Sequence, residues 1–321
     1  MRGSIAFIVA AVLTWSGLAV AQDYPSKPIR LVVPFPPGGP VDAIARVVSQ
    51  KMAGLLGQSV VIENRNGAGG VIGTQMAAKA EPDGYTIALT SAGALALSQG
   101  LHDKVPYDPL KDIRLLTQVA NTPEVLALGR GIEARSLAEL IALAKQRPGR
   151  LNFATAGKGS MSHLSLELFR QTAGIDITIV HYSGAGQAVN DLIGGHVDAL
   201  FADIQVLLGS VQSGTLRALA IGGQRRAVPL PDLATTAELG LPRVVAFNWY
   251  GMVAQPGLSP PIAAKLTNTI IAAVRSDEVK ARLVPQGVEL VGNTPEEFSA
   301  FLRTEINRWG EVIRKAGIKA E

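Results

Sequence analysis

The sequence contains no cysteine, and this absence removes several kinds of chemistry from consideration. Without thiols the chain forms no disulfide, carries no thiolate nucleophile and offers no cysteine ligand to a metal. Aromatic residues are also scarce, at 5% of the 321 residues, and charged residues make up 17%. Small and aliphatic residues supply the apolar content instead, a mixture that is typical of parallel strands covered by helices.

Positive charge is present but it is not concentrated anywhere. The net charge is +4, and no run of lysine and arginine with interleaved aromatic residues occurs. Nucleic-acid binding is therefore not indicated. Because 47% of the residues are hydrophobic, the chain can bury a large core and we do not expect disorder.

The longest apolar run lies at the N-terminus. Arg2 precedes a mostly apolar stretch over residues 5–20, and Ala19-Val20-Ala21 has the small-x-small pattern of a cleavage site. The stretch is shorter than the roughly 20 residues that a membrane-spanning helix needs. We therefore predict a cleavable signal peptide over residues 1–21 and export of the mature protein to the periplasm.

Two series of expected strands and helices follow, one over residues 29–90 and one over residues 136–221. Both repeat the order strand, loop, helix, which predicts parallel strands with right-handed crossovers. A mostly helical segment, residues 260–316, ends the chain. We expect two α/β lobes, with the chain crossing between them near Gln118–Val125 and again near Arg243–Phe247.

Four turns occupy equivalent places, each after a predicted parallel strand and before a helix, and three of them are rich in glycine or serine. They are residues 35–41, 156–162, 182–187 and 202–203. Ligands bind at that edge of α/β sheets, where helix N-termini present free N–H groups and partial positive charge. The four turns together predict a cleft in which backbone donors hold an anionic group such as a carboxylate. Each turn alone would more simply be an ordinary connection between a strand and a helix.

The enzyme motifs fail on inspection. Gly157-Lys158-Gly159-Ser160 lacks the spacing of a phosphate-binding loop, and residues 67–73 are out of register for a dinucleotide fingerprint. His181 stands where a nucleophile elbow requires glycine, and the four histidines show no metal-ligand spacing. We therefore predict no catalysis, no metal and no cofactor.

Three polar residues at the same edge deserve separate interpretation. His163 falls in the first turn of a helix that faces the expected cleft, and Asp42 suits helix capping. Asp203 at this edge would favour ligands that also carry an amine or a hydroxyl. An enzyme acting on a carboxylated substrate stays open as an alternative, but it would need His163 and Asp203 to meet, and the sequence does not place them together.

The motifs, taken in order, resemble those of the Bug (Bordetella uptake gene) family, the solute receptors of tripartite tricarboxylate transporters. The resemblance covers the mature chain. Its matching segments are Tyr24–Arg30, Pro34–Asp42, Glu63–Arg65, Gly67–Gly70, Pro82–Thr86, Pro106–Pro109, Gly157–His163, Asp191–Asp198, Leu216–Ala220 and Trp249–Gly251. Lys158 departs from the small or polar residue expected at its place.

The resemblance implies a two-domain periplasmic binding protein fold of type II-like form, in which each domain is a mostly parallel α/β sheet flanked by helices. Two hinge crossings would divide the mature chain into domain 1, residues 22–119 and 247–321, and domain 2, residues 120–246. Such a receptor closes on a small carboxylate in the interdomain cleft and delivers it to the membrane components of the transporter. We expect a monomer. A receptor that partners a sensor kinase stays open as an alternative.

The resemblance also implies which residues contact the ligand, and it leaves open which acid that is. Two loops, 35–41 and 156–163, are expected on one side, with single residues opposite them. The expected contacts are Phe35, Gly38, Gly39, Pro40, Val41, Ser91, Ala156, Gly157, Ser160, His163, Ser183 and Asp203.

Overall fold

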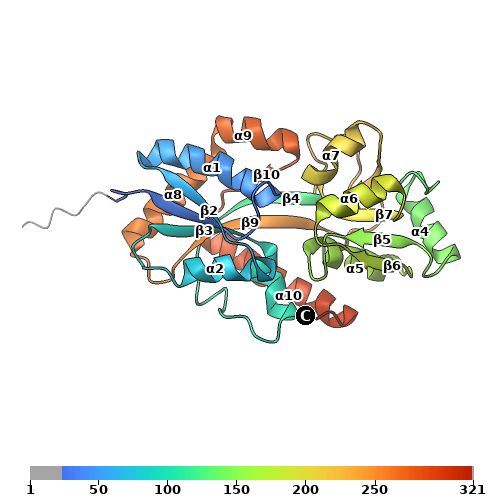
Figure 1. Cartoon of the computed structure of the whole chain (residues 1–321), viewed down its shortest axis with the longest axis horizontal. Coiled ribbons are helices and arrows are strands. Elements are labelled where there is room, and N and C mark those ends of the chain that lie inside the picture. Colours follow the sequence, from blue (N-terminus) through green and yellow to red (C-terminus); the bar gives the residue numbers. More distant parts are fainter. Residues whose placement is uncertain (1–23, 320–321) are drawn as a thin grey trace, which may run out of the picture.

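The computed structural model describes residues 24–319, so the predicted signal peptide lies outside the described residues. Figure 1 shows two lobes side by side along the long axis of the molecule. The strands are β1 (Ile29–Val33), β2 (Val60–Asn64), β3 (Thr86–Ser91), β4 (Arg114–Leu128), β5 (Asn152–Thr155), β6 (Thr178–His181), β7 (Ala199–Asp203), β8 (Arg217–Ile221), β9 (Phe247–Ala254) and β10 (Glu289–Leu290). The α-helices are α1 (Pro40–Leu56), α2 (Val71–Ala78), α3 (Ser98–Leu101), α4 (Leu137–Gln146), α5 (Met161–Ala173), α6 (Ala185–Gly194), α7 (Ile204–Gln212), α8 (Pro260–Arg275), α9 (Asp277–Leu283) and α10 (Pro295–Ala316).

Three neighbouring strands in each lobe run parallel, as the repeated strand–helix order predicts. In the first lobe β1 lies between β2 and β3, so that Leu31 is in register with both Ile62 and Ile87. In the second lobe β5 lies between β6 and β7 in the same way. The carboxyl ends of three strands therefore meet at one edge of the sheet in each lobe.

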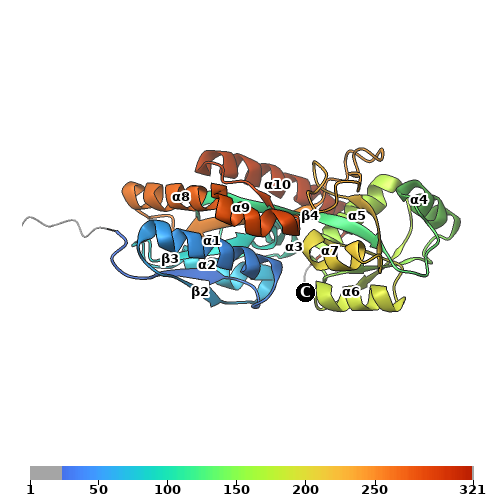
Figure 2. The same ribbon diagram turned by 90° about the horizontal axis from the view of Figure 1, so that it is seen from above.

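The antiparallel strands lie where the lobes join. β4 is a 15-residue strand that pairs with β9 as far as Pro123 and with β7 from Glu124 onward. Figure 2 shows this strand crossing from one lobe to the other. The chain returns at Ala246, whose carbonyl accepts a hydrogen bond from Glu124 N–H at 3.0 Å. β8 and the short β10 add antiparallel pairs to β4.

The change of sheet at Pro123 and Glu124, together with the return at Ala246, supports a division of the chain into two hinged domains. We propose the limits expected from the sequence, residues 22–119 with 247–321 and residues 120–246. β4 itself belongs to both sheets, which makes it the natural hinge strand.

Helices cover both faces of each sheet because the strand residues alternate between two apolar cores. In β1, Leu31 and Val33 face the core formed with α1, α8 and α9. Val32 faces the opposite core, which α2, α3 and α10 cover. In the second lobe α4 and α5 cover one face while α6 and α7 cover the other. No helix in residues 24–319 is both long and apolar enough to cross a bilayer.

Candidate functional site

A cavity of about 510 Å³ lies between the lobes, at the carboxyl ends of the parallel strands. Loops from both lobes line it. The first lobe contributes Pro34, Phe35, Pro36, Asn66, Gly67, Ala68, Gly69, Gly70, Ser91, Gly93, Ser98, Leu101 and His102. The second lobe contributes Ala156, Gly157, Lys158, Gly159, Ser160, Met161 and Ser183, and Asn248 comes from β9.

The loop after β1 places one predicted residue, Phe35, at the cavity. The Nδ2 amide of Asn64 holds the Phe35 carbonyl at 3.0 Å. Gly38 and Gly39 belong to the turn that leads into α1, and Pro40 and Val41 are the first two residues of that helix. None of the four is among the lining residues. For these four residues, ligand contact stays a prediction.

The carboxylate of Asp42 holds this turn in place. Its Oδ2 accepts a hydrogen bond from Gly38 N–H at 3.0 Å and forms an ion pair with Arg46 at 2.8 Å, while its Oδ1 accepts from Asn64. Burial alone would raise the pKa of Asp42, but the hydrogen bonds from Arg46, Gly38 and Asn64 outweigh it and lower the pKa. Asp42 is therefore an anchored carboxylate beneath the loop, and the Gly38 amide is already engaged.

The glycine-rich turn at Gly67–Gly70 also lines the cavity, although the sequence motifs alone did not assign it to the site. Gly70 lies at φ +97°, and a β-carbon there would come within 3.1 Å of the Phe35 ring. Glycine is therefore required for the ring to pack against this turn. The N–H groups of Ala68 and Gly69 make no hydrogen bond to another residue of the described chain, which leaves two donors at the cavity. Its place shortly after β2 could have predicted that this turn lies at the same edge of the sheet as the other loops.

The loop between β5 and α5 contributes the largest group of lining residues from the second lobe. Ser160 caps α5 by accepting a hydrogen bond from His163 N–H at 3.2 Å, and its hydroxyl donates to the Gly157 carbonyl at 2.6 Å. Ser162 points inward instead, accepting from Ala156 N–H at 3.2 Å and donating to the Phe201 carbonyl. The loop is thus held in shape by its own hydroxyls, with the N-terminus of α5 at the cavity.

His163 is buried beneath this loop rather than lining the cavity, with 4% of its surface exposed. Its Nδ1 accepts a hydrogen bond from Gly159 N–H at 3.0 Å, and its ring packs edge-to-face with that of His181, with the ring centroids 4.4 Å apart. Burial, followed by the charges of His181, Lys158 and Arg170, lowers the pKa of His163 to about 4. His163 is therefore neutral at physiological pH and serves as a hydrogen-bond acceptor for the loop.

The remaining predicted residues separate into two groups. Ser91, at the end of β3, and Ser183, after β6, line the cavity as expected for ligand contacts. Asp203 does not line it. Its Oδ2 instead accepts hydrogen bonds from Tyr250 at 3.3 Å and from Asn248 at 3.5 Å. Asn248 lines the cavity and was missed, because a polar residue in an apolar strand carries no signal of its own.

The charge of the cavity favours an anion. No aspartate or glutamate is among the described residues that line it, whereas Lys158 and His102 are. The positive end of the 13-residue helix α5 adds to this balance. Within residues 24–319 no group of three or more histidine, aspartate or glutamate side chains is arranged to hold a metal ion.

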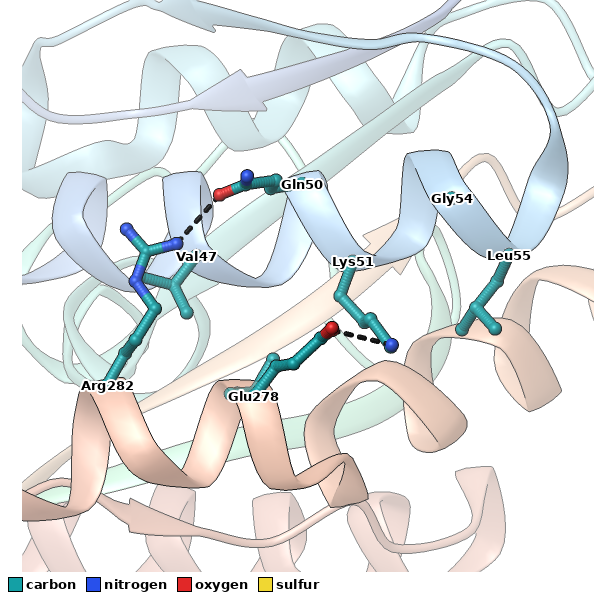
Figure 3. Close-up of a pocket in the computed structure, with 8 residues that line it drawn as sticks. Val47, Gln50, Lys51, Gly54, Leu55, Glu278 and Arg282 are labelled. Carbon is teal, nitrogen blue, oxygen red and sulfur yellow. Dashed lines mark hydrogen bonds and ion pairs between the residues drawn. The ribbon is translucent and has the colours of Figure 1, made fainter.

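A second pocket, of about 570 Å³, lies on the outside of the first lobe between α1 and α9 (Figure 3). An ion pair at 2.6 Å joins Lys51 to Glu278 across it, and Arg282 donates to the Gln50 side chain at 2.7 Å. Its polar groups are thus satisfied by each other. The pocket is also remote from the carboxyl ends of the parallel strands, so the cavity between the lobes is the candidate site.

Two α/β lobes joined by crossing strands, with a cavity between their loops, define a solute-binding protein of the periplasmic binding class. The family model of the tripartite tricarboxylate transporter family receptor, TctC, matches residues 44–318. The chain belongs to this family, and the resemblance to the Bug proteins is confirmed. It is 40% identical to Protein BugT of Bordetella pertussis over 316 residues, which cover 97% of each chain.

Two solved structures are similar along nearly their whole length. R. palustris Rpa4515 with adipate superposes with a TM-score of 0.84 at 33% identity, covering 92% of this chain and 99% of that one. MatC (Rpa3494) from Rhodopseudomonas palustris with bound malate gives a TM-score of 0.79 at 32% identity, covering 90% of this chain and 100% of that one. The two-domain periplasmic binding protein fold predicted from the sequence is thereby confirmed.

Proposed function

We propose that this protein captures a small carboxylate in the cavity between its lobes and delivers it to the membrane components of a tripartite tricarboxylate-type transporter. The observation that carries the proposal is the lining of the cavity, in which backbone donors and Lys158 are present and acidic side chains are not. The adipate and malate bound to the two solved relatives support the same class of ligand.

The carboxylate is held by main-chain donors from both lobes. The free N–H groups of Ala68 and Gly69 lie on one side, and the N-terminus of α5 lies on the other. Charge-assisted hydrogen bonds of this kind contribute about 1.5–3 kcal/mol each. Phe35 supplies an apolar wall for the carbon chain of the ligand.

Binding closes the lobes about the two crossings, because a ligand that contacts both loop sets stabilises the closed form and not the open one. Hinge closure of periplasmic binding proteins is a well-known example of such motion, which we assign to this chain from its class. Pro123, Glu124 and Ala246 are the positions at which the backbone must bend. The closed form is the one that the membrane components recognise.

The protein acts in the periplasm as a monomer, after removal of residues 1–21, and catalyses no reaction. The absence of catalysis is supported by the positions of His163 and Asp203, the two residues that an enzyme would need to bring together. His163 is bonded to Gly159 and Asp203 to Tyr250, and no hydrogen bond joins the two.

A thermal-shift screen of mono-, di- and tricarboxylates, amino acids, aromatic acids, neutral sugars and cations tests the proposal. Ligands that bind only the folded form raise the midpoint by linkage. We expect carboxylates, and dicarboxylates such as malate and adipate among them, to raise it. Stabilisation by sugars or cations alone would contradict the proposal.

A further inference from the structure

A buried and a half-buried acidic side chain face each other at the point where β4 leaves one sheet for the other. Glu124 on β4 is the register partner of Asp203 at the end of β7. Glu124 is 1% exposed, and its Oε2 has no hydrogen-bond partner among the described residues. The Oδ1 atom of Asp203 is equally shielded and equally without a partner there.

No cation compensates this pair within the described chain. Neither acid takes part in an ion pair that joins residues 24–319, and Tyr250 on β9 is the ionisable group that contacts Asp203. Charged side chains on the other elements packed around β4, β7 and β9 are engaged elsewhere. They are Arg170 with Glu167 on α5, Asp191 with Tyr182 on α6, Arg217 with Ile132 and Ala134 on β8, Lys265 with Tyr24 and Arg275 with Gly292 on α8, Glu289 with Arg225 on β10, and Glu305 with Arg308 on α10. His163 on α5 is neutral, and Arg114, the first residue of β4, donates to the Leu258 carbonyl.

Two adjacent carboxylates without a counter-charge cannot both stay ionised in such a place. Burial, and then the charge of Asp203, raises the pKa of Glu124 well above its ordinary value, although the Ser165 hydroxyl opposes the rise. Burial raises the pKa of Asp203 to about 7, although hydrogen bonds from Asn248 and Tyr250 oppose the rise. At neutral pH the pair therefore keeps a proton.

One side chain, that of Asn248, separates the pair from the cavity. The Nδ2 amide of Asn248, which lines the cavity, is 3.5 Å from the Oδ2 of Asp203. An anion bound at Asn248 brings a further negative charge close to the pair. That charge disfavours ionisation of Asp203 and Glu124 and favours retention of their proton.

We propose that Glu124 and Asp203 form a proton-binding pair at the hinge, and that an anionic ligand entering the cavity is bound together with a proton taken up by this pair. The linkage rests on the carboxylate capture proposed above, whereas the shared proton does not. Because linkage is reciprocal, protonation of the pair strengthens anion binding by the same factor as the anion strengthens protonation.

The shared proton can be observed without any ligand. Carboxyl ¹³C resonances are followed by NMR from pH 4 to pH 9 in the wild-type protein, in Asp203→Asn and in Glu124→Gln. We expect the pair to titrate above about pH 6, where ordinary carboxyls are fully ionised. In each variant the remaining carboxyl should titrate at a lower pH, because its charged neighbour is gone. Ionisation of both groups below about pH 5 in the wild type would overturn the proposal.

The linkage is measured by calorimetry with malate and with adipate, in buffers of different ionisation enthalpy between pH 6 and pH 9. We expect net proton uptake, and a Kd that rises with pH by roughly tenfold for each unit by which the anion raises the pKa of the pair. Asp203→Asn should abolish both effects. Glu311→Gln, which removes an exposed acid paired with Lys315 on α10, should retain them.

The outcomes separate the two proposals. Binding of either acid without proton uptake, and with a Kd independent of pH, overturns the linkage and leaves carboxylate capture intact. Failure of both acids to bind overturns the linkage together with capture of these acids, and the NMR titration then decides the shared proton alone.

Discussion

The Nδ1 atom of His163 accepts a hydrogen bond from the main-chain N–H of Gly159 at 3.0 Å, which ties the first turn of α5 to the loop that lines the cavity. An imidazolium has no lone pair at Nδ1 and cannot make this bond. The shape of the loop therefore depends on a neutral His163.

This dependence predicts a loss of stability in mild acid. Because the pKa of His163 is about 4 in the folded protein and 6.5 in the unfolded chain, the unfolded chain binds more protons between these values. The free energy of unfolding should thus fall as the pH drops from 6.5 toward 4, by up to about 3 kcal/mol. The pH dependence of urea unfolding, compared between wild type and His163→Gln, isolates this contribution. The matched control is the same substitution at the exposed His196.

Asp42 is the second support of the cavity, because its carboxylate holds Gly38, Arg46 and Asn64 at once. Asp42→Asn keeps the shape of the side chain but removes its charge and one acceptor oxygen. We expect the free energy of unfolding to fall by about 1–3 kcal/mol, as is usual for hydrogen bonds to charged groups. The exposed Glu311→Gln should change it by less than about 0.5 kcal/mol in the same urea titration. Equal effects of the two substitutions would contradict the role assigned to Asp42.

Ser183 offers a test of the sign of the charge that the cavity accepts. It lines the cavity from the second lobe and is exposed, so Ser183→Glu should fold normally. An added carboxylate there should repel an anionic ligand and raise the Kd for malate or adipate roughly tenfold or more. Ser213→Glu, at an exposed turn after α7, makes the same change without facing the cavity. Unchanged affinity in Ser183→Glu would show that the anion binds elsewhere.

Gly69 and Gly70 form a matched pair for testing the wall that Phe35 provides. Both have positive φ, +62° and +97°, so alanine at either position costs stability. A β-carbon on Gly69 meets nothing within 4 Å, whereas one on Gly70 comes within 3.1 Å of the Phe35 ring. Calorimetry should therefore show weaker carboxylate binding in Gly70→Ala than in Gly69→Ala. Weaker binding in Gly69→Ala than in Gly70→Ala would contradict the assignment of Phe35 to the site.

The parts of this fold that the sequence predicts are those whose pattern is local. An apolar run followed by glycine, serine or proline predicts β1, β3 and the loops before α1 and α5. The long strand β4 does not, because Thr117, Gln118 and Thr122 are buried polar residues that break its apolar pattern. They can be buried because partners elsewhere in the chain satisfy their polar groups. The Asn293 carbonyl accepts a hydrogen bond from the Thr117 hydroxyl, and the Asn293 Oδ1 accepts one from Gln118 N–H.

The site was predicted in part for the same reason. Ser91 ends β3, and Phe35 and Ser183 come shortly after β1 and β6, so their place in the chain puts them at the cavity. His163 in the first turn of α5 and Asp203 at the end of β7 lie at the same edge, but their side chains bond to Gly159 and Tyr250 and do not line the cavity. The direction of a side chain depends on partners that are distant in sequence, and the spacing of residues along the chain does not predict those partners.

A crystal structure with the carboxylate that gives the largest thermal shift tests the central claim most directly. We expect the carboxylate between the lobes, with its oxygens within hydrogen-bond distance of main-chain N–H groups from both Gly67–Gly70 and the start of α5. We also expect the lobes to be closer together than in the ligand-free protein. A ligand that contacts one lobe only, or that occupies the groove between α1 and α9, would contradict the account.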